Sequence, residues 1–279
     1  MRLTVLGSGG FRRTPRPGCH CPVCEEMRDA GTQRLGCSLF LHDGNILFDT
    51  PEEIAAELES AGIHRIEHLF FTHWHPDHTL GARILEIMNT QWSERPEWRM
   101  AAVHRTDVHM PGPVYGEIMS RLGPFFEFWQ HLGIAKVELM DAPVQAENVK
   151  VEAVVFKTMH RTMTHSTVYI VSSQSKKFVY APCDITPFPK DDRVHGCDLM
   201  ILQVGWHGPE MAERARNGPH YEISMDEIIE IAREYKPTKL VLTHIGDEVG
   251  MLRKDLETLE ETYADLNLQF AHDGMVILI

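Results

Sequence analysis

The sequence is poor in basic residues and has no long hydrophobic run. Its 279 residues include 27 Lys and Arg against 40 Asp and Glu, a formal net charge of −13. A chain of this charge lacks the basic footprint of nucleic-acid-binding proteins, so we expect no nucleic acid among its partners. No apolar stretch reaches the roughly 18 to 20 residues that a membrane-spanning helix needs, and the first residues lack the apolar segment of a secretory signal. We therefore expect a cytoplasmic protein without a membrane partner.

Cysteine is also scarce, and it is unevenly placed. Six Cys in a chain of this size do not indicate a disulfide framework. Cys19, Cys21 and Cys24 nevertheless lie within six residues, a density that is typical of metal binding. Redox-active thiols or coincidence are the alternatives, but the Cys-x-Cys-x-x-Cys spacing favours a structural zinc that stabilises the fold. Cys183 stands apart from the cluster and is interpreted as a small packed residue.

The pattern of apolar runs predicts one domain of the α+β class. No linker, repeat or low-complexity tract divides residues 1–279. Alternating or short apolar runs predict strands at 3–6, 38–41, 45–49, 66–71, 149–156, 168–172, 178–181, 199–204, 240–242 and 275–279. Helical spacing and capping signals predict helices at 51–62, 224–234 and 253–266. Two strand sets with intervening helices fit two sheets between helical layers.

An aromatic segment separates the two strand sets. Near residues 82–141 we predict a helical insertion, because Tyr115 to Trp129 place apolar side chains at helical intervals, with a kink or break at Gly123-Pro124. A helix that buries its apolar stripe explains this pattern. A lid or a dimer face is the functional alternative, so a homodimer is one expectation.

The strongest functional signal follows the predicted strand at 66–71. His73-Trp74-His75-Pro76-Asp77-His78 places four potential metal ligands within six residues. His73 and His75 are two residues apart, so on an extended segment both point to the same side and can bind one metal ion. Pro76 favours a turn that directs Asp77 and His78 towards a neighbouring position. The motif therefore predicts part of a metal site.

The missing ligands are expected at other strand ends. His160, Asp184 and His244 each come just after a predicted apolar strand, where sheet proteins commonly carry functional side chains. His165 competes with His160 for the third position. We prefer His160, because it comes directly after its strand.

These residues, in this order, resemble the metallo-β-lactamase superfamily over nearly the whole chain. The resemblance implies an αβ/βα four-layer sandwich of two mixed sheets flanked by helices. It also implies that one divalent ion is bound by His73, His75 and His160. The second would be bound by Asp77, His78 and His244, with Asp184 bridging both.

Within that superfamily the chain is most similar to the PhnP-type cyclic phosphodiesterases. The similar segments are Gly18-Cys19-His20-Cys21-Pro22-Val23-Cys24, Cys37-Ser38, Leu242-Thr243-His244-Ile245 and His272-Asp273-Gly274-Met275. That family binds a structural zinc through three Cys and a His three residues after the last catalytic His. Asp247 stands there in this chain, so either Asp247 is the fourth zinc ligand or the structural site is altered. The family's proton-donating His matches His220.

The resemblance implies a hydrolase with two catalytic Zn or Mn ions and one structural zinc. Its substrate would be a small, in particular cyclic, phosphodiester, attacked by a hydroxide held between the ions. Asp184, with Asp77, would orient the hydroxide, and His220 would give a proton to the leaving group. The alternatives are a lactone or thioester hydrolase, a redox or pyrroloquinoline-quinone-biosynthesis member of the superfamily, and a binding module. Transfer-RNA processing fits poorly with the net charge of −13.

Overall fold

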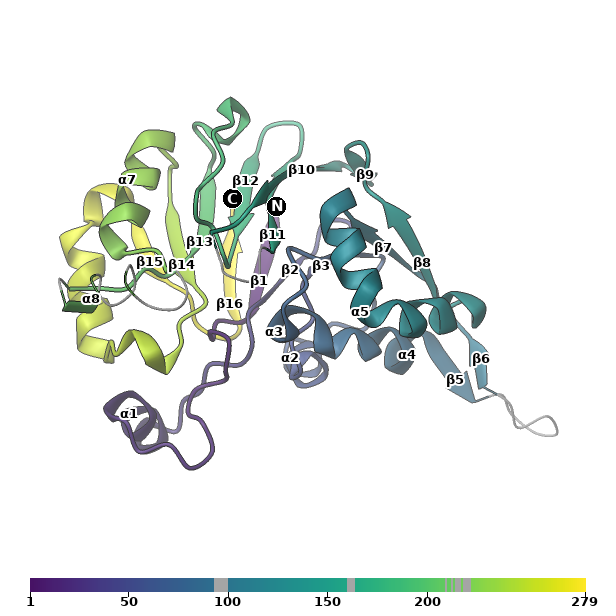
Figure 1. Cartoon of the computed structure of the whole chain (residues 1–279), viewed down its shortest axis with the longest axis horizontal. Helices are drawn as coiled ribbons and strands as arrows, with labels where there is room; N and C mark the ends of the chain where they lie inside the picture. Colours follow the sequence, from purple (N-terminus) through teal and green to yellow (C-terminus); the bar gives the residue numbers. More distant parts are fainter. Residues whose placement is uncertain (93–99, 160–163, 209, 212, 214–216, 218–221) are drawn as a thin grey trace.

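The computed structural model describes the chain except residues 93–99, 160–163, 209, 212, 214–216 and 218–221. Two seven-stranded sheets dominate it (Figure 1). The first has the order β16-β1-β2-β3-β4-β7-β8, and the second β15-β14-β13-β12-β11-β10-β9. A small two-stranded sheet, β5-β6, stands beside the first. No helix in the described part of the chain is long and apolar enough to cross a membrane.

The strands of the first sheet are β1 (Arg2–Gly7), β2 (Ser38–Leu41), β3 (Ile46–Phe48), β4 (His68–Phe70), β7 (Thr106–Met110), β8 (Ala135–Leu139) and β16 (Met275–Leu278). Those of the second are β9 (Val144–Ala146), β10 (Val149–Lys157), β11 (His165–Ser172), β12 (Lys177–Ala181), β13 (Leu199–Gln203), β14 (Leu240–Thr243) and β15 (Leu268–Phe270). The small sheet pairs β5 (Thr90–Trp92) with β6 (Met100–Ala102).

The described helices are α1 (Pro22–Ala30), α2 (Ile54–Ser60), α3 (Pro76–Thr79), α4 (Ile84–Asn89), α5 (Gly112–His131), α7 (Met225–Tyr235) and α8 (Arg253–Thr262). Short 3₁₀ turns occur at η1 (Leu80–Arg83), η2 (Asp192–Val194), η3 (Asp247–Val249) and η4 (Ala264–Leu266). Helix α7 begins with the predicted capping box between Ser224 and Glu227.

Three buried clusters show that the chain forms four layers. Side chains alternate across each strand, so successive residues serve different clusters. Leu39 and Leu41 of β2, for example, face the cluster between the two sheets, whereas Phe40 faces the cluster under α2, α4 and α5. In the second sheet, Tyr169 of β11 faces the central cluster and Ile170 the cluster under α7 and α8. Figure 1 shows α7 and α8 on the outer side of the second sheet and α5 on the side of the first. The predicted αβ/βα sandwich is therefore confirmed.

Most predicted elements lie where the sequence placed them, with two differences. The segment near 82–141, predicted to be a helical insertion, contains α5 but also supplies β7 and β8 to the first sheet. Helix α5 also runs through Pro124 without the break that is one of the two predicted outcomes. Proline removes one helical hydrogen bond, but Phe126 and Trp129 beyond it are buried against the first sheet. Their packing holds the second half of the helix in line.

Candidate metal centre

The candidate ligands come together because strands from both sheets end at the same place. The motif His73 to His78 follows β4, Asp184 follows β12, and His244 directly follows β14. β3 and β4 are parallel neighbours, as are β12, β13 and β14, so residues after these strands gather at one edge of each sheet. The two edges meet, because Nδ1 of His75 lies 3.3 Å from Oδ2 of Asp184.

Three residues at these strand ends have a left-handed backbone. The φ angles of Asp49, Asp184 and His244 are 62°, 50° and 60°. Such angles are uncommon outside glycine, and residues held in them are concentrated at functional sites. The turn at each strand end directs a carboxylate or an imidazole into the same region. The local backbone is therefore shaped for the placement of these side chains.

A first ligand group consists of His73, His75 and Asp184. The potential ligand atoms of the three residues all lie within 4.8 Å of one another. His73 is completely buried, and its Nε2 lies 3.9 Å from Oδ2 of Asp184. Nε2 of His75 is 3.4 Å from the hydroxyl of Thr164. That hydroxyl also accepts a hydrogen bond from the Trp74 indole. Nδ1 of His75 is thus the nitrogen directed at the site.

A second ligand group consists of Asp77, His78 and His244. Their potential ligand atoms also lie within 4.8 Å of one another. Oδ2 of Asp77 is 3.4 Å from Nε2 of both His78 and His244, and the two imidazole rings are nearly parallel at 6°. Burial alone would raise the pKa of Asp77, but His78 and the hydrogen bond from His244 outweigh it and hold that pKa below its usual range. Asp77 is therefore an anion that faces two imidazoles.

Asp49 orients one imidazole in each ligand group, contacting His78 directly and His73 through Thr72. Its Oδ2 lies 2.9 Å from Nδ1 of His78, and its two oxygens accept hydrogen bonds from the backbone N–H and the hydroxyl of Thr72. The hydroxyl of Thr72 is in turn 3.0 Å from Nδ1 of His73. A carboxylate behind an imidazole fixes the ring and leaves the other nitrogen available to a metal ion. Nε2 of His78 is fully buried and makes no hydrogen bond within the described part of the chain.

The donor set suits divalent cations. Four imidazoles and two carboxylates converge, and these are the nitrogen and oxygen ligands that zinc binds. A buried ring nitrogen without a hydrogen bond, as at His78, would be costly unless a ligand takes it. A cation satisfies both this nitrogen and the carboxylates. Asp184 falls in the first group only, so its role as a bridge to the second stays a prediction.

The remaining predicted site residues divide into two cases. His160 and His220 lie outside the described residues, so the structure does not place their side chains. His165, the alternative to His160, is the first residue of β11, and its Nδ1 lies 2.9 Å from Glu117 of α5. Of the described residues, neither ligand group includes His165. Its imidazole is instead held by a carboxylate.

Both ligand groups border a cavity of about 470 Å³, within the size range of small-molecule sites. His75, Asp77, Asp184 and His244 form part of its wall. Other described residues in the wall are aromatic, apolar, polar or acidic, with no Lys or Arg among them: Phe11, Pro76, Cys183, Gln203, Val204, Trp206, Glu222, Glu248 and Val249. The site is therefore open to a small ligand, and its described wall offers carboxyl groups and imidazoles but no Lys or Arg.

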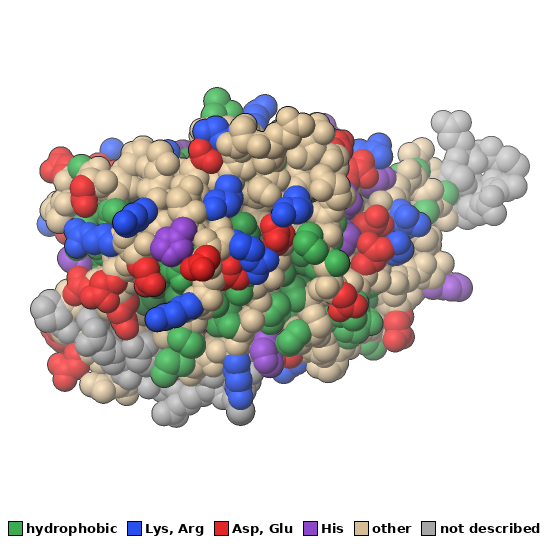
Figure 2. Space-filling view, turned by 90° about the horizontal axis from the view of Figure 1, so that it is seen from above, with side chains coloured by type: hydrophobic (Ala, Val, Ile, Leu, Met, Phe, Trp, Pro, Cys, Tyr) green, Lys and Arg blue, Asp and Glu red, His purple; other side chains and the backbone are tan. Residues whose placement is uncertain are grey.

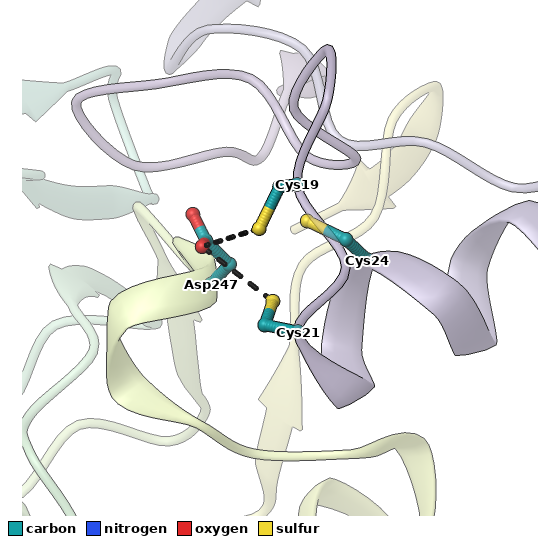
Figure 3. Close-up of side chains that lie close together, drawn as sticks. All are labelled: Cys19, Cys21, Cys24 and Asp247. Atoms are coloured by element: carbon teal, nitrogen blue, oxygen red, sulfur yellow. Dashed lines mark hydrogen bonds between the residues drawn. The ribbon is translucent and has the colours of Figure 1, made fainter.

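A separate cluster lies where α1 meets η3 (Figure 3). Cys19, Cys21, Cys24 and Asp247 bring their potential ligand atoms within 4.8 Å of one another. Oδ2 of Asp247 is 3.9 Å from Sγ of Cys19 and 3.7 Å from Sγ of Cys21. Three sulfurs and one carboxylate oxygen are a suitable set for a tetrahedral zinc ion. Asp247, 223 residues from the nearest of the three Cys in sequence, thus lies at the position of a fourth ligand.

Arg16 supports this cluster with its positive charge. Its guanidinium donates to both oxygens of Asp247, with Nε 2.9 Å from Oδ1 and Nη2 2.8 Å from Oδ2. Nη2 also lies 3.2 Å from Sγ of Cys19. Burial opposes ionisation of Asp247, but these hydrogen bonds hold its pKa below the usual value. The carboxylate is therefore charged and fixed.

Sequence analysis missed the positioning residues. Asp49 carries the same signal as Asp184, a carboxylate just after an apolar strand, and could have been found by that rule. Thr164 and Arg16 carry no such signal. They lie 89 residues from His75 and 231 residues from Asp247, so only the fold shows their contacts.

Comparisons with known proteins identify the family of this fold. Residues 44–245 match the family described as the Beta-lactamase superfamily domain. A curated ribonuclease Z of Streptomyces avermitilis is 24% identical over 235 residues, which cover 82% of this chain and 68% of that protein. With two other curated relatives, an octanoyltransferase of Porphyromonas gingivalis and a ribonuclease Z of Pyrococcus furiosus, the match spans only 17% and 27% of their length.

Solved structures show the same fold. A diphosphatase of the PhnP family superposes with a TM-score of 0.69 at 22% identity, covering 99% of this chain and 97% of that one. The zinc-bound PqqB of Methylobacterium extorquens superposes with a TM-score of 0.73 at 15% identity, covering 100% of both chains. The match over residues 44–245 spans most of the chain, from the hairpin before β3 to the residue after His244. The chain therefore belongs to the metallo-β-lactamase superfamily.

Proposed function

We propose that this chain is a two-metal-dependent phosphodiesterase that hydrolyses a small, in particular cyclic, phosphodiester. The observation that carries the proposal is the pair of ligand groups side by side in one cavity wall. His73, His75 and Asp184 form one group, and Asp77, His78 and His244 the other. Two divalent ions, when bound, supply Lewis-acid stabilisation of phosphate oxygens and a hydroxide nucleophile at neutral pH.

The chain's own residues would hold and orient the reacting groups. Asp77 and Asp184 face the cavity from opposite sheets and are the carboxylates best placed to accept a hydrogen bond from the attacking water. His160 remains the proposed third ligand of the first group. His220 remains the proposed proton donor to the leaving alkoxide, and Glu222, two residues later, lies in the cavity wall.

Several features favour a small substrate over a nucleic acid. The cavity of about 470 Å³ suits a molecule of nucleotide size. The described residues of its wall include no Lys or Arg that could bind a run of phosphates. The net charge of −13 also disfavours binding of a polyanion such as a nucleic acid. On the face drawn in Figure 2, Lys and Arg are interspersed with Asp and Glu. These features argue against the action on RNA that the name ribonuclease Z gives for the relatives.

The test combines metal content with a substrate panel. Purified protein would be analysed for bound metals and assayed with a cyclic nucleotide phosphodiester, bis-p-nitrophenyl phosphate, a lactone and a pre-tRNA. We expect about three zinc or manganese equivalents and hydrolysis of the phosphodiesters. Lactone hydrolysis alone would contradict the proposed substrate class. Two iron equivalents without hydrolysis would favour the redox class instead.

A matched pair of variants ties the activity to the site. His78→Ala removes a ligand of the second group, so phosphodiester hydrolysis should be lost together with about one metal equivalent. His64→Ala removes an exposed imidazole outside both groups and should leave activity and metal content unchanged. Full activity of His78→Ala would contradict the two-metal proposal.

A further inference from the structure

Cys183 is a buried residue that lies beside the candidate metal centre. It follows β12 and directly precedes Asp184, and it contributes to the wall of the cavity that both ligand groups border. Its side chain is only 8% exposed. Sγ of Cys183 and a ring nitrogen of each of His73 and His78 all lie within 4.8 Å of one another. The thiol thus lies close to one imidazole from each ligand group.

A second observation points to a ligand at this position. Nε2 of His78 is completely buried, makes no hydrogen bond within the described residues and lies 3.4 Å from Oδ2 of Asp77, and His78 belongs to the set that includes the Cys183 sulfur. Asp49 holds the opposite nitrogen of the same ring at 2.9 Å, so the ring cannot easily turn away. A fixed, buried nitrogen close to both a sulfur and a carboxylate is an arrangement that a thiophilic metal ion satisfies.

We propose that Cys183 is a sulfur ligand of this centre, so that a thiophilic divalent ion binds to His73, His78 and Cys183. On coordination the thiol releases its proton to water, and the thiolate forms the metal–sulfur bond. The inference rests on the proposed metal centre. An ion held in this way uses one imidazole of each ligand group and therefore competes with simultaneous occupation of both groups.

The proposal makes the centre selective for soft ions. Thiolate binds Zn²⁺, Co²⁺ and Cd²⁺ well, whereas Mn²⁺ prefers oxygen ligands. Loss of a residue that hydrogen-bonds to a metal ligand commonly costs about 10- to 100-fold in metal affinity, and loss of a direct ligand should cost at least as much. We therefore expect Cys183→Ala to weaken Cd²⁺ binding at this centre by at least about tenfold, with little change for Mn²⁺.

Cobalt substitution tests the sulfur ligand directly. Metal-free wild type and Cys183→Ala would be titrated with Co²⁺, and the thiolate-to-cobalt charge-transfer absorption compared. The cluster of Cys19, Cys21 and Cys24 contributes equally to both proteins and cancels in the difference spectrum. We expect the variant to lose the contribution of one thiolate. Cys197→Ala, at a fully buried thiol in the cluster under α7 and α8, should match wild type.

The outcomes separate failure of the inference from failure of the proposed function. Equal charge-transfer absorption in wild type and Cys183→Ala at equal cobalt content would overturn the inference alone. If wild type binds cobalt only at the Cys cluster, the metal centre itself fails. Should Cys183→Ala not fold, alkylation of native wild type by N-ethylmaleimide gives the answer by mass spectrometry. Protection of Cys183 by Cd²⁺ but not by Mn²⁺ supports the ligand role, and equal alkylation overturns it.

Discussion

Nδ1 of His78 lies 2.9 Å from Oδ2 of Asp49, and both side chains are completely buried. Asp49 belongs to neither ligand group among the described residues, yet it also accepts two hydrogen bonds from Thr72, the residue before His73. One carboxylate thus fixes the backbone and the ring of the central motif. The burial lowers the pKa of His78, but Asp77 and Asp49 more than compensate and raise it to about 9. The two carboxylates thus favour a positive charge at this position, which is supplied by a proton on the ring or, in its place, by a bound cation.

The variant Asp49→Asn tests this role. Asparagine keeps the size of the side chain but removes its charge, so His78 loses the carboxylate that orients it. We expect metal affinity at the second ligand group to fall about 10- to 100-fold. Competition with a chromophoric chelator measures it. Asp43→Asn, at an exposed Asp in the hairpin before β3, is the matched control. Wild-type affinity in a folded Asp49→Asn protein would show that the contact is only structural.

Much of the fold could be predicted because local patterns decide it. β2 was predicted at its observed bounds, and α7 was found from its capping box. The strands β7 and β8 were missed, because their residues do not form a long apolar run. β7 contains Thr106, Asp107 and His109, and β8 contains Lys136 and Glu138. β7 becomes a strand by pairing with β4, which is far away in sequence, and β8 becomes one by pairing with β7 across helix α5.

The site could be predicted in part for a related reason. His73, His75, Asp77 and His78 are adjacent in sequence, so their spacing carried the signal. Asp184 and His244 could be found because each follows an apolar strand. The hydrogen bond between Asp49 and His78, 29 residues apart, exists only once β3 and β4 lie side by side. Ligands can therefore be read from residue type and spacing, whereas the residues that orient them depend on the fold.

Asp247 gives a second prediction, at the Cys cluster. Asp247→Ala should release the structural metal, because three Cys without a fourth ligand bind zinc less tightly, and the lost binding energy lowers stability. Metal analysis should show about one equivalent less, with a lower thermal midpoint. Asp247→His replaces the carboxylate by another zinc ligand and should retain the metal. A full metal complement in Asp247→Ala would mean that Asp247 serves only as the partner of Arg16.

A third prediction concerns Glu57, a buried acid away from both metal sites. Only 2% of the residue is exposed, and its Oε2 accepts a hydrogen bond of 2.6 Å from the hydroxyl of Ser38. Burial raises the pKa of Glu57 to about 8, although the hydrogen bond from Ser38 opposes the rise. The native state therefore binds this proton more tightly than the unfolded state does. The contribution of this proton to the stability of the fold is fully present below the pKa of Glu57 in the unfolded chain, near 4.5. It is lost as the pH rises through the pKa of about 8 in the folded protein.

The variant Glu57→Gln cannot ionise at this position, so it should not lose stability as the pH rises through the pKa of Glu57. We expect the variant to gain stability relative to wild type as the pH rises from 5 to 9, by an amount on the order of 4 kcal/mol, since each pH unit is worth about 1.4 kcal/mol. Urea unfolding at pH 5, 7 and 9 measures the difference. Glu59→Gln, at an exposed position of the same helix, should follow wild type at each pH. A constant difference between Glu57→Gln and wild type would contradict the raised pKa.

The last prediction separates proton transfer from metal binding at His220. Its sequence position matches the family's proton donor, and Glu222, two residues later, contributes to the wall of the cavity. If His220 gives a proton to the leaving alkoxide, His220→Ala should lower kcat about 10²- to 10⁴-fold while both metals remain bound. A substrate whose leaving group needs no proton, such as p-nitrophenolate, should be affected far less. The control is His207→Ala, at an exposed imidazole outside the cavity wall, which should behave like wild type. Metal loss in His220→Ala would instead identify His220 as a ligand, because a residue that only donates a proton has no effect on metal content.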